Sequence, residues 1–212
     1  MDGGWAANRW GMFVAMLFGG ARSCLVGGRS HANKSLAWLN EAVRFRAAGK
    51  DELLLDASGH TLARLVPAPR SETPPTVAEP PELRAKELSN LRRELLADAR
   101  LPAGLRAATR QELVGRWVPA NPAQDHRGQE AYLLLSADGS WTGSDGCNGY
   151  YGRWEAGDGG RLVVVSGGST LIGCDNVPVG GWLETARRAG FHGRVLVLVD
   201  PYGHVTGRLR RP

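Results

Sequence analysis

One cysteine, two histidines and an aspartate in the C-terminal half are the residues best suited to nucleophilic chemistry. Cys147 could attack a carbonyl carbon, with His192 or His204 as general base and Asp200 orienting the histidine, as in a cysteine hydrolase. Their spacing in the sequence does not by itself bring them together. His204, like His60, follows the glycine of an expected hairpin turn, where a solvent-exposed side chain is the ordinary outcome. We therefore expect no catalytic residues, and a cysteine-dependent hydrolase using Cys147 is the alternative.

Residue types that bind metals and cofactors occur without the spacing that such sites need. The chain has no Cys-x-x-Cys motif, and no histidine lies near a cysteine at the spacing of zinc ligands. The segment 159–170, GGRLVVVSGGST, lacks the Lys-Ser or Lys-Thr that ends a P-loop. Three aspartates on successive expected turns lack the spacing of a calcium loop: Asp138, Asp145 and Asp158. We expect neither a metal nor a cofactor.

Charge and hydropathy exclude two classes of protein. The 212 residues include 26 Lys and Arg and 21 Asp and Glu, for a net charge of +5. The basic residues form no block and few aromatics lie among them, so nucleic acid is not an expected partner. No apolar run reaches the roughly 18–20 residues of a membrane-spanning helix, which excludes an integral membrane segment. The 29 glycines favour short strands joined by many turns.

An internal repeat organises the chain. Residues 49–65, GKDELLLDASGHTLARL, match residues 193–209, GRVLVLVDPYGHVTGRL, at a constant offset of 144 positions. The same offset pairs Trp38-Leu39 with Trp182-Leu183. The sequence therefore predicts that the N-terminal part is a second, incomplete copy of the latter half of the C-terminal part.

Each copy has the pattern of a short helix followed by a hairpin. Apolar residues at helical spacing predict one buried helix face, formed by Trp182, Leu183, Ala186 and Ala189. A β-branched run at 195–199 predicts a strand, and Asp200-Pro201-Tyr202-Gly203 suits a type I turn before a returning strand at 205–209. We expect Trp182 and Leu183 to pack the helix onto the sheet, and Trp38 and Leu39 to do the same in the first copy.

A break in composition separates the copies. Residues 67–81 carry six of the 12 prolines and predict an extended linker. Residues 82–99 read as an amphipathic helix, either a connector packed on one domain or a helix that binds a partner. The expected domains are an incomplete repeat at 1–66, a linker and connector helix at 67–112, and a β-rich domain at 113–212 that folds independently.

The segment 11–21, GMFVAMLFGGA, followed by Arg22-Ser23-Cys24, has two interpretations. It resembles a short lipoprotein signal that ends at a cysteine. The repeat instead predicts a buried strand that leads to the copy of Cys174. Export therefore stays open at this stage.

The ordered motifs of the C-terminal part resemble the META domain family (HslJ-like, the type of heat-inducible lipoproteins). GSDGCNGYYGRW at 143–154 and GGSTLIGCDN at 167–176 precede the Trp-Leu helix and the final hairpin. The resemblance covers 113–212 as a complete copy and 10–66 as an incomplete one. It implies an α+β fold, an antiparallel sheet wrapped around a short helix. The motif residues that carry the resemblance are Gly146, Cys147, Asn148, Gly152, Thr170 and Cys174.

The resemblance also implies a cysteine pair and a function. In the family pattern the two cysteine segments flank one strand, which implies that the α-carbons of Cys147 and Cys174 lie within about 7 Å, close enough for a disulfide. Cys24 is then the odd cysteine. Whether Cys147 and Cys174 form the disulfide or stay reduced and buried depends on the compartment, which is open at this stage. We expect Gly146, Asn148 and Thr170 to have structural roles in the turns, with a ligand-contacting loop as the alternative. The family implies an exported or envelope-associated protein. The expected function is a non-catalytic binding or envelope-stress module with an unknown protein or envelope partner.

Overall fold

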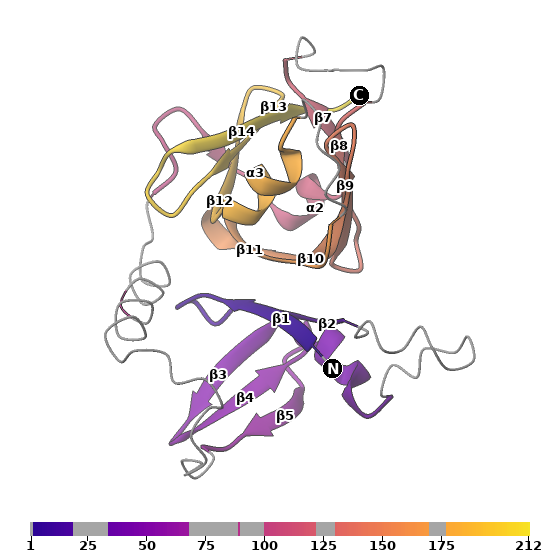
Figure 1. The fold of residues 1–212 in the computed structure, drawn as a ribbon. Coiled ribbons are helices and arrows are strands. Elements are labelled where there is room, and N and C mark those ends of the chain that lie inside the picture. The colour runs from indigo at the N-terminus through magenta and orange to yellow at the C-terminus, as the bar shows by residue number, and fades with distance from the viewer. Residues whose placement is uncertain (1, 19–33, 68–88, 90–99, 122–129, 170–176) are drawn as a thin grey trace, which may run out of the picture.

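The computed structural model describes residues 2–18, 34–67, 89, 100–121, 130–169 and 177–212 (Figure 1). This part of the chain is mainly antiparallel β-sheet with a few short helices. The expected antiparallel sheet is confirmed, but the α+β class is corrected to mainly β. Short strands and glycine turns leave little room for helices, and the only helices described span seven residues or fewer.

Eight antiparallel strands form a closed barrel in the C-terminal part. In chain order they are β7 (Gly115–Pro119), β8 (Tyr132–Leu135), β9 (Ser140–Ser144), β10 (Gly149–Gly157), β11 (Arg161–Ser166), β12 (Arg188–His192), β13 (Val195–Val199) and β14 (Val205–Arg210). Each pairs with the next along the chain, except that β14 returns to β7, and a bridge between β11 and β12 closes the ring. The short β6 (Arg106–Ala107) lies beside β12.

The barrel is filled by helix α3 (Val179–Thr185) and by large apolar side chains (Figure 1). Leu183 on α3 is fully buried, and Trp182 lies against Gly207, where an added Cβ would meet its ring. The expected packing of this Trp-Leu pair is therefore confirmed. The core also contains Trp117, Trp141 and Trp154.

The helix is shorter than the sequence predicts. It ends at Thr185, and Ala186 has an extended backbone with ψ of 139°. Ala189 is not on the helix but in β12, from which it enters the same core. Both alanines are buried, as predicted, but the prediction that Ala189 lies on the helix is wrong. Ala189 faces the core from a strand, and its position in the sequence fits the helical period by coincidence.

Helix α2 (Arg110–Leu113) closes the barrel beside β10. Thr109 caps it, since its hydroxyl accepts from the Glu112 backbone while the Glu112 carboxylate accepts from the Thr109 backbone. Ala108 and Leu113 are part of the barrel core. The expected boundary at residue 113 therefore lies inside the packed unit.

The N-terminal part contains a hairpin, a 3-10 helix and a three-stranded sheet. The elements are β1 (Asp2–Ala7), β2 (Phe13–Phe18), η2 (Lys34–Asn40), β3 (Arg44–Ala48), β4 (Asp51–Leu55) and β5 (Thr61–Leu65). An antiparallel bridge between Met12 and Arg44 joins the hairpin to the sheet. The strand expected within 11–21 is confirmed as β2, whereas Cys24 lies outside the described residues.

The predicted repeat is present in the backbone. Every pairing of β3 with β4 and of β4 with β5 recurs 144 positions later in β12, β13 and β14. Even the register irregularity recurs, between Leu54 and Leu55 in one copy and between Leu198 and Val199 in the other. The expectation that the chain holds two copies of one hairpin unit is confirmed.

The repeat also extends further than the sequence shows. The β1–β2 hairpin matches β10–β11 at an offset of 149 positions, so that the pair Trp5/Ala15 corresponds to Trp154/Val164. The bridge of Met12 to Arg44 corresponds to the bridge of Arg161 to Arg188. We call β1–β5 with η2 the half copy, and the barrel β7–β14 with α3 the complete copy. The half copy begins at β1 rather than at residue 10, and has no counterpart of β7, β8 and β9 among the described residues.

The two copies pack through equivalent strands. The outer face of β2 lies on the outer face of β11 (Figure 1), where Met12 and Val14 form one apolar cluster with Val163. Val14 and Val163 are themselves counterparts in the repeat. Between the copies, Ser89 is helical and exposed, and the rest of the expected linker and connector helix at 68–99 lies outside the described residues. Among the described residues no helix is long and apolar enough to cross a membrane.

Candidate functional site

The family-like turn between β9 and β10 is organised by Asp145. Its Oδ1 accepts hydrogen bonds from the backbone N–H groups of Cys147 at 2.8 Å and Asn148 at 2.5 Å. Its Oδ2 accepts from Asn148 Nδ2 at 3.2 Å and from the Tyr150 hydroxyl at 2.6 Å. Gly146 supplies the left-handed backbone, with φ of 93°. Asp145 is only 2% exposed, so the carboxylate is the buried centre of the turn.

The protonation states of this turn are fixed near neutral pH. Burial opposes ionisation of Asp145, but the hydrogen bonds from Asn148, Tyr150 and Cys147 lower its pKa below the ordinary range. Burial, and then the bond to Asp145, raises the pKa of Tyr150 to about 12. An acid that stays ionised and a phenol that stays neutral cannot exchange protons at physiological pH. The hydrogen bonds of this turn therefore do not change near neutral pH.

The structure describes some of the predicted motif residues and not others. Asn148 is buried and bonded through its side chain, as expected of a structural turn residue. A Cβ at Gly152 would lie 2.1 Å from the Val165 carbonyl, so only glycine fits there. Cys147 is disulfide-bonded, and its partner is not among the described residues. Thr170 and Cys174 also lie outside them, so the Cys147–Cys174 pair remains a prediction.

The residues of the alternative cysteine hydrolase do not form a triad. A disulfide-bonded Cys147 carries no thiolate. His204 contacts Asp200 at 3.1 Å within the exposed β13–β14 turn, and His60 contacts Asp56 at 3.3 Å in the equivalent turn of the half copy. The His–Asp contact is therefore a feature that both hairpin turns share.

The three aspartates considered for calcium have separate surroundings. Asp138 accepts from the backbone and hydroxyl of Ser140, and Asp145 holds its own turn. Asp158 lies in the short loop between β10 and β11. Among the described residues no group of three metal-binding side chains comes together.

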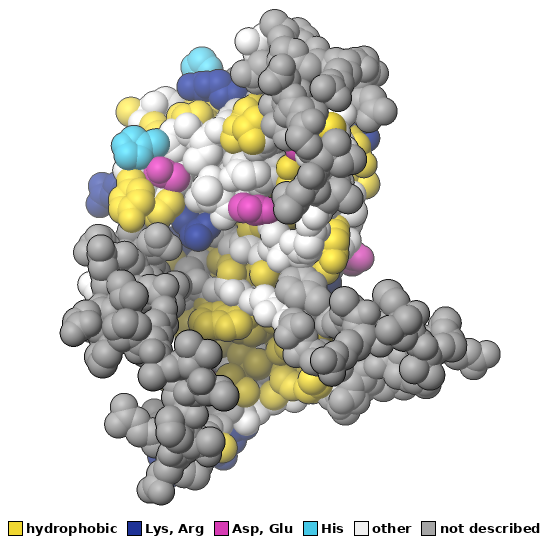
Figure 2. All heavy atoms as spheres, in the orientation of Figure 1, with side chains coloured by type: hydrophobic (Ala, Val, Ile, Leu, Met, Phe, Trp, Pro, Cys, Tyr) yellow, Lys and Arg dark blue, Asp and Glu magenta, His cyan; other side chains and the backbone are white. Residues whose placement is uncertain are grey.

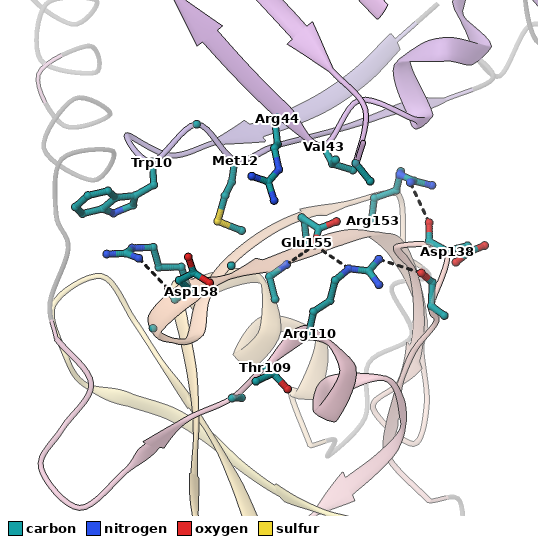
Figure 3. Close-up of a pocket in the computed structure, with 18 of the residues that line it drawn as sticks. Trp10, Met12, Val43, Arg44, Thr109, Arg110, Asp138, Arg153, Glu155 and Asp158 are labelled. Atoms are coloured by element: carbon teal, nitrogen blue, oxygen red, sulfur yellow. Dashed lines mark hydrogen bonds and ion pairs between the residues drawn. The ribbon is translucent and has the colours of Figure 1, made fainter. Parts of the chain in front are cut away.

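A cavity between the two copies is the main candidate site (Figure 3). Its volume is about 870 Å³, in the range of small-molecule sites. Trp10, Met12 and Arg44 point into it from the half copy, facing Arg110 and Arg153 of the complete copy. Both copies are therefore needed to form the site.

Four arginines line this cavity, and only one has a carboxylate partner among the described residues. Arg110 pairs with Glu155 at 2.8 Å. Arg153 donates to two backbone carbonyls, of Asn40 at 2.6 Å and Asp138 at 3.2 Å.

The side chains of the two other cavity arginines, Arg44 and Arg161, form fewer hydrogen bonds. The Arg161 guanidinium lies 3.9 Å from the centre of the Trp10 ring and donates to the Asp158 carbonyl, but its buried Nε has no hydrogen-bond partner. The Arg44 side chain forms neither a hydrogen bond nor an ion pair with any described residue.

The cavity is lined by as many carboxylates as arginines. The carboxylates are those of Glu41, Asp138, Glu155 and Asp158. Burial lowers the pKa of Arg153, because its positive charge is less well solvated there than in water, while the charges of Asp138 and Glu155 act in the opposite direction. An anion would therefore bind through the placement of single guanidinium groups and not through an excess of positive charge.

Sequence reasoning missed this site. Arg44 and Arg161 lie far apart in the sequence, and Met12 and Arg161 are counterparts in the repeat. Only the packing of β2 on β11 brings them together. The one signal in the sequence was the repeat, since duplicated units commonly enclose a site between them.

Protein-family models include none that matches the sequence, and no curated protein or solved structure matches it either.

Proposed function

We propose that this chain is a non-catalytic binding protein, built from a META-like barrel and a half copy, that holds a small anionic ligand in the cavity between them. The observation that carries the proposal is the set of Arg44, Arg153 and Arg161, which line one cavity and form no ion pair with a described residue. Guanidinium groups bind carboxylates and phosphates through paired hydrogen bonds. The apolar side chains of Trp10 and Met12 favour an organic anion over a bare ion.

The contacts that hold Arg153 and Arg161 in place support binding. Arg153 is held by carbonyls from both copies, and Arg161 is held by the Trp10 ring. A ligand that bridges Arg44 to these two groups would join the copies more tightly. Because little reorganisation is needed, most of the contact energy would contribute to affinity.

The disulfide supports a non-catalytic protein of the cell envelope. Disulfides persist in oxidising compartments such as the bacterial periplasm, and Cys147 is disulfide-bonded. The resemblance to the META family agrees with an exported binding or envelope-stress module. Under this proposal the partner is an envelope component that carries an anionic group.

Isothermal titration calorimetry of the full chain tests the anion site, with inorganic phosphate and citrate as probes. Arg44→Ala should weaken binding about tenfold or more, since a charge-assisted hydrogen bond contributes about 1.5–3 kcal/mol. Arg46→Ala is the matched control, because Arg46 is exposed on the same strand and does not line the cavity. Equal affinities in the two variants, or no heat with either probe, would contradict the proposal.

Thiol labelling tests the cysteine-hydrolase alternative. Iodoacetamide at neutral pH should leave Cys147 unmodified in the folded protein and modify it after reduction, because a disulfide sulfur does not alkylate. Peptide mass spectrometry identifies the modified residue and its bonded partner. Rapid modification of Cys147 without reductant would favour the hydrolase.

A further inference from the structure

Positions that form the core of the complete copy are exposed in the half copy. Trp154 is 1% exposed, whereas its counterpart Trp5 is 63% exposed and only stacks on Phe13. Leu209 is 1% exposed, whereas its counterpart Leu65 is 48% exposed. Figure 2 shows apolar side chains gathered over the lower half of the molecule, where the half copy lies. A folded protein rarely leaves large apolar side chains clustered in water without a partner.

The exposed positions lie on the two open edges of the half copy. Among the described residues, β1 pairs only with β2, and β5 pairs only with β4. Their counterparts β10 and β14 have second neighbours, β9 and β7. Natural proteins cover such edges or place charges on them. Here the edges carry Trp5 on one side and Leu65 and Val66 on the other.

Strand direction restricts what can close the gap. Four successive antiparallel pairings connect β1 to β5, through β2, β3 and β4, so β1 and β5 run parallel to each other. They are therefore mismatched for antiparallel pairing within one chain. A second copy of the chain, rotated by a two-fold axis perpendicular to the strands, presents its own β1 antiparallel to β1 and its own β5 antiparallel to β5. Five strands from each copy then give an even number, as a fully antiparallel ring requires.

We propose that the half copy is completed by the half copy of a second chain, in a two-fold symmetric dimer. The dimer pairs β1 of one protomer with β1 of the other, which covers Trp5, and β5 with β5, which covers Leu65 and Val66. A two-fold interface uses the same patch on both protomers, and this patch contains both edges. Glu52 on β4 is exposed at the position that corresponds to buried Leu196. The interior of the proposed ring is therefore apolar beside β1 and β5 and contains water beside β4.

Sedimentation velocity of the full chain over a wide concentration range tests the dimer. We expect a species of twice the 22.8 kDa protomer mass. Leu65→Glu and Trp5→Glu should each raise the dimer dissociation constant by about tenfold or more, since a charge would enter the strand interface. Leu134→Glu is the matched control, because Leu134 is similarly exposed on a strand but belongs to the closed barrel.

The outcomes separate the proposal from its competitors. A protomer that stays monomeric to millimolar concentration overturns it. Equal weakening by Leu65→Glu and Leu134→Glu shows a non-specific apolar association and also overturns it. Open-ended oligomers would point to a head-to-tail contact in place of the two-fold. Circular dichroism confirms that each variant is folded, and phosphate or citrate titration of the Leu65→Glu variant separates this inference from the proposed anion site.

Discussion

The two copies share their turns but not their cores. In both copies an aspartate at the end of a strand accepts two backbone N–H bonds within the turn: Asp56 accepts from Ser58 and His60, and Asp200 from Tyr202 and His204. The equivalent tryptophans, by contrast, are 63% and 1% exposed. The turns need only the residues within them, whereas burial of the tryptophan needs β9 and the strands beyond it. The turn thus forms without counterparts of β7, β8 and β9 among the described residues, whereas the tryptophan is not buried without them.

The largest expected effect is on the equivalent tryptophans. Trp154→Ala should reduce the free energy of unfolding by about 3–5 kcal/mol, because it empties the barrel core. Trp5→Ala should cost about 0.5 kcal/mol or less in dilute solution, where this side chain is exposed. Urea unfolding followed by circular dichroism measures both. Similar losses for the two variants would mean that Trp5 is buried in the protomer, and the comparison would fail.

Asp145 should show the next largest effect, because its buried carboxylate accepts several hydrogen bonds in a turn that has no equivalent among the described residues of the half copy. Asp145→Asn should cost about 1.5–3 kcal/mol at neutral pH, since the charged acceptor of buried hydrogen bonds is lost. The pKa of Asp145 is lowered in the folded state from its ordinary 3.8. Its contribution is therefore complete above that pH and is lost as the pH falls through the folded-state value.

The measurement for Asp145 is the difference in unfolding free energy between wild type and Asp145→Asn across the acid range. This difference isolates Asp145 from Asp56, Asp138 and Asp200, whose pKa values are also lowered. It should shrink as the pH falls below about 3.8. A difference that does not depend on pH would show that the carboxylate charge is unimportant in the turn.

The smallest expected effect is one that the two copies share. Gly49 and Gly193 have left-handed backbones, with φ of 69° and 58°, and each has open space where a Cβ would lie. Alanine at either position should cost about 1 kcal/mol, from backbone strain alone. Thermal unfolding of the two variants measures the loss. A much larger cost at Gly193 would show that these turns depend on their barrel after all.

The hairpins were predictable from sequence because their determinants are close together. Asp200 and Gly203 alone define the last turn, and the repeat confirmed it through Asp56 and Gly59. The end of α3 was not predictable, because Ala189 fits a helical period while facing the core from β12. A small apolar residue that faces the core from a nearby strand can have the same sequence spacing as one on the buried face of the helix.

Only the structure identifies the residue that organises the turn and the residues that form the cavity. The sequence pointed to Cys147 and Asn148, but the buried acceptor of both is Asp145, which sequence reasoning considered only as a metal ligand. Arg44 and Arg161 come together through the contact of β2 with β11, which has no local pattern. Residues that depend on packing between distant segments carry no periodic signal.

The contact of β2 with β11 has a consequence for how firmly the two copies are joined. A few apolar side chains, centred on Val14 and Val163, make this contact. As an association between separate molecules it would be weak, but a covalent connection holds the copies at an effective concentration on the order of millimolar. The connection between the copies is therefore part of what maintains the cavity, because a small apolar contact is sufficient only when its two sides cannot diffuse apart.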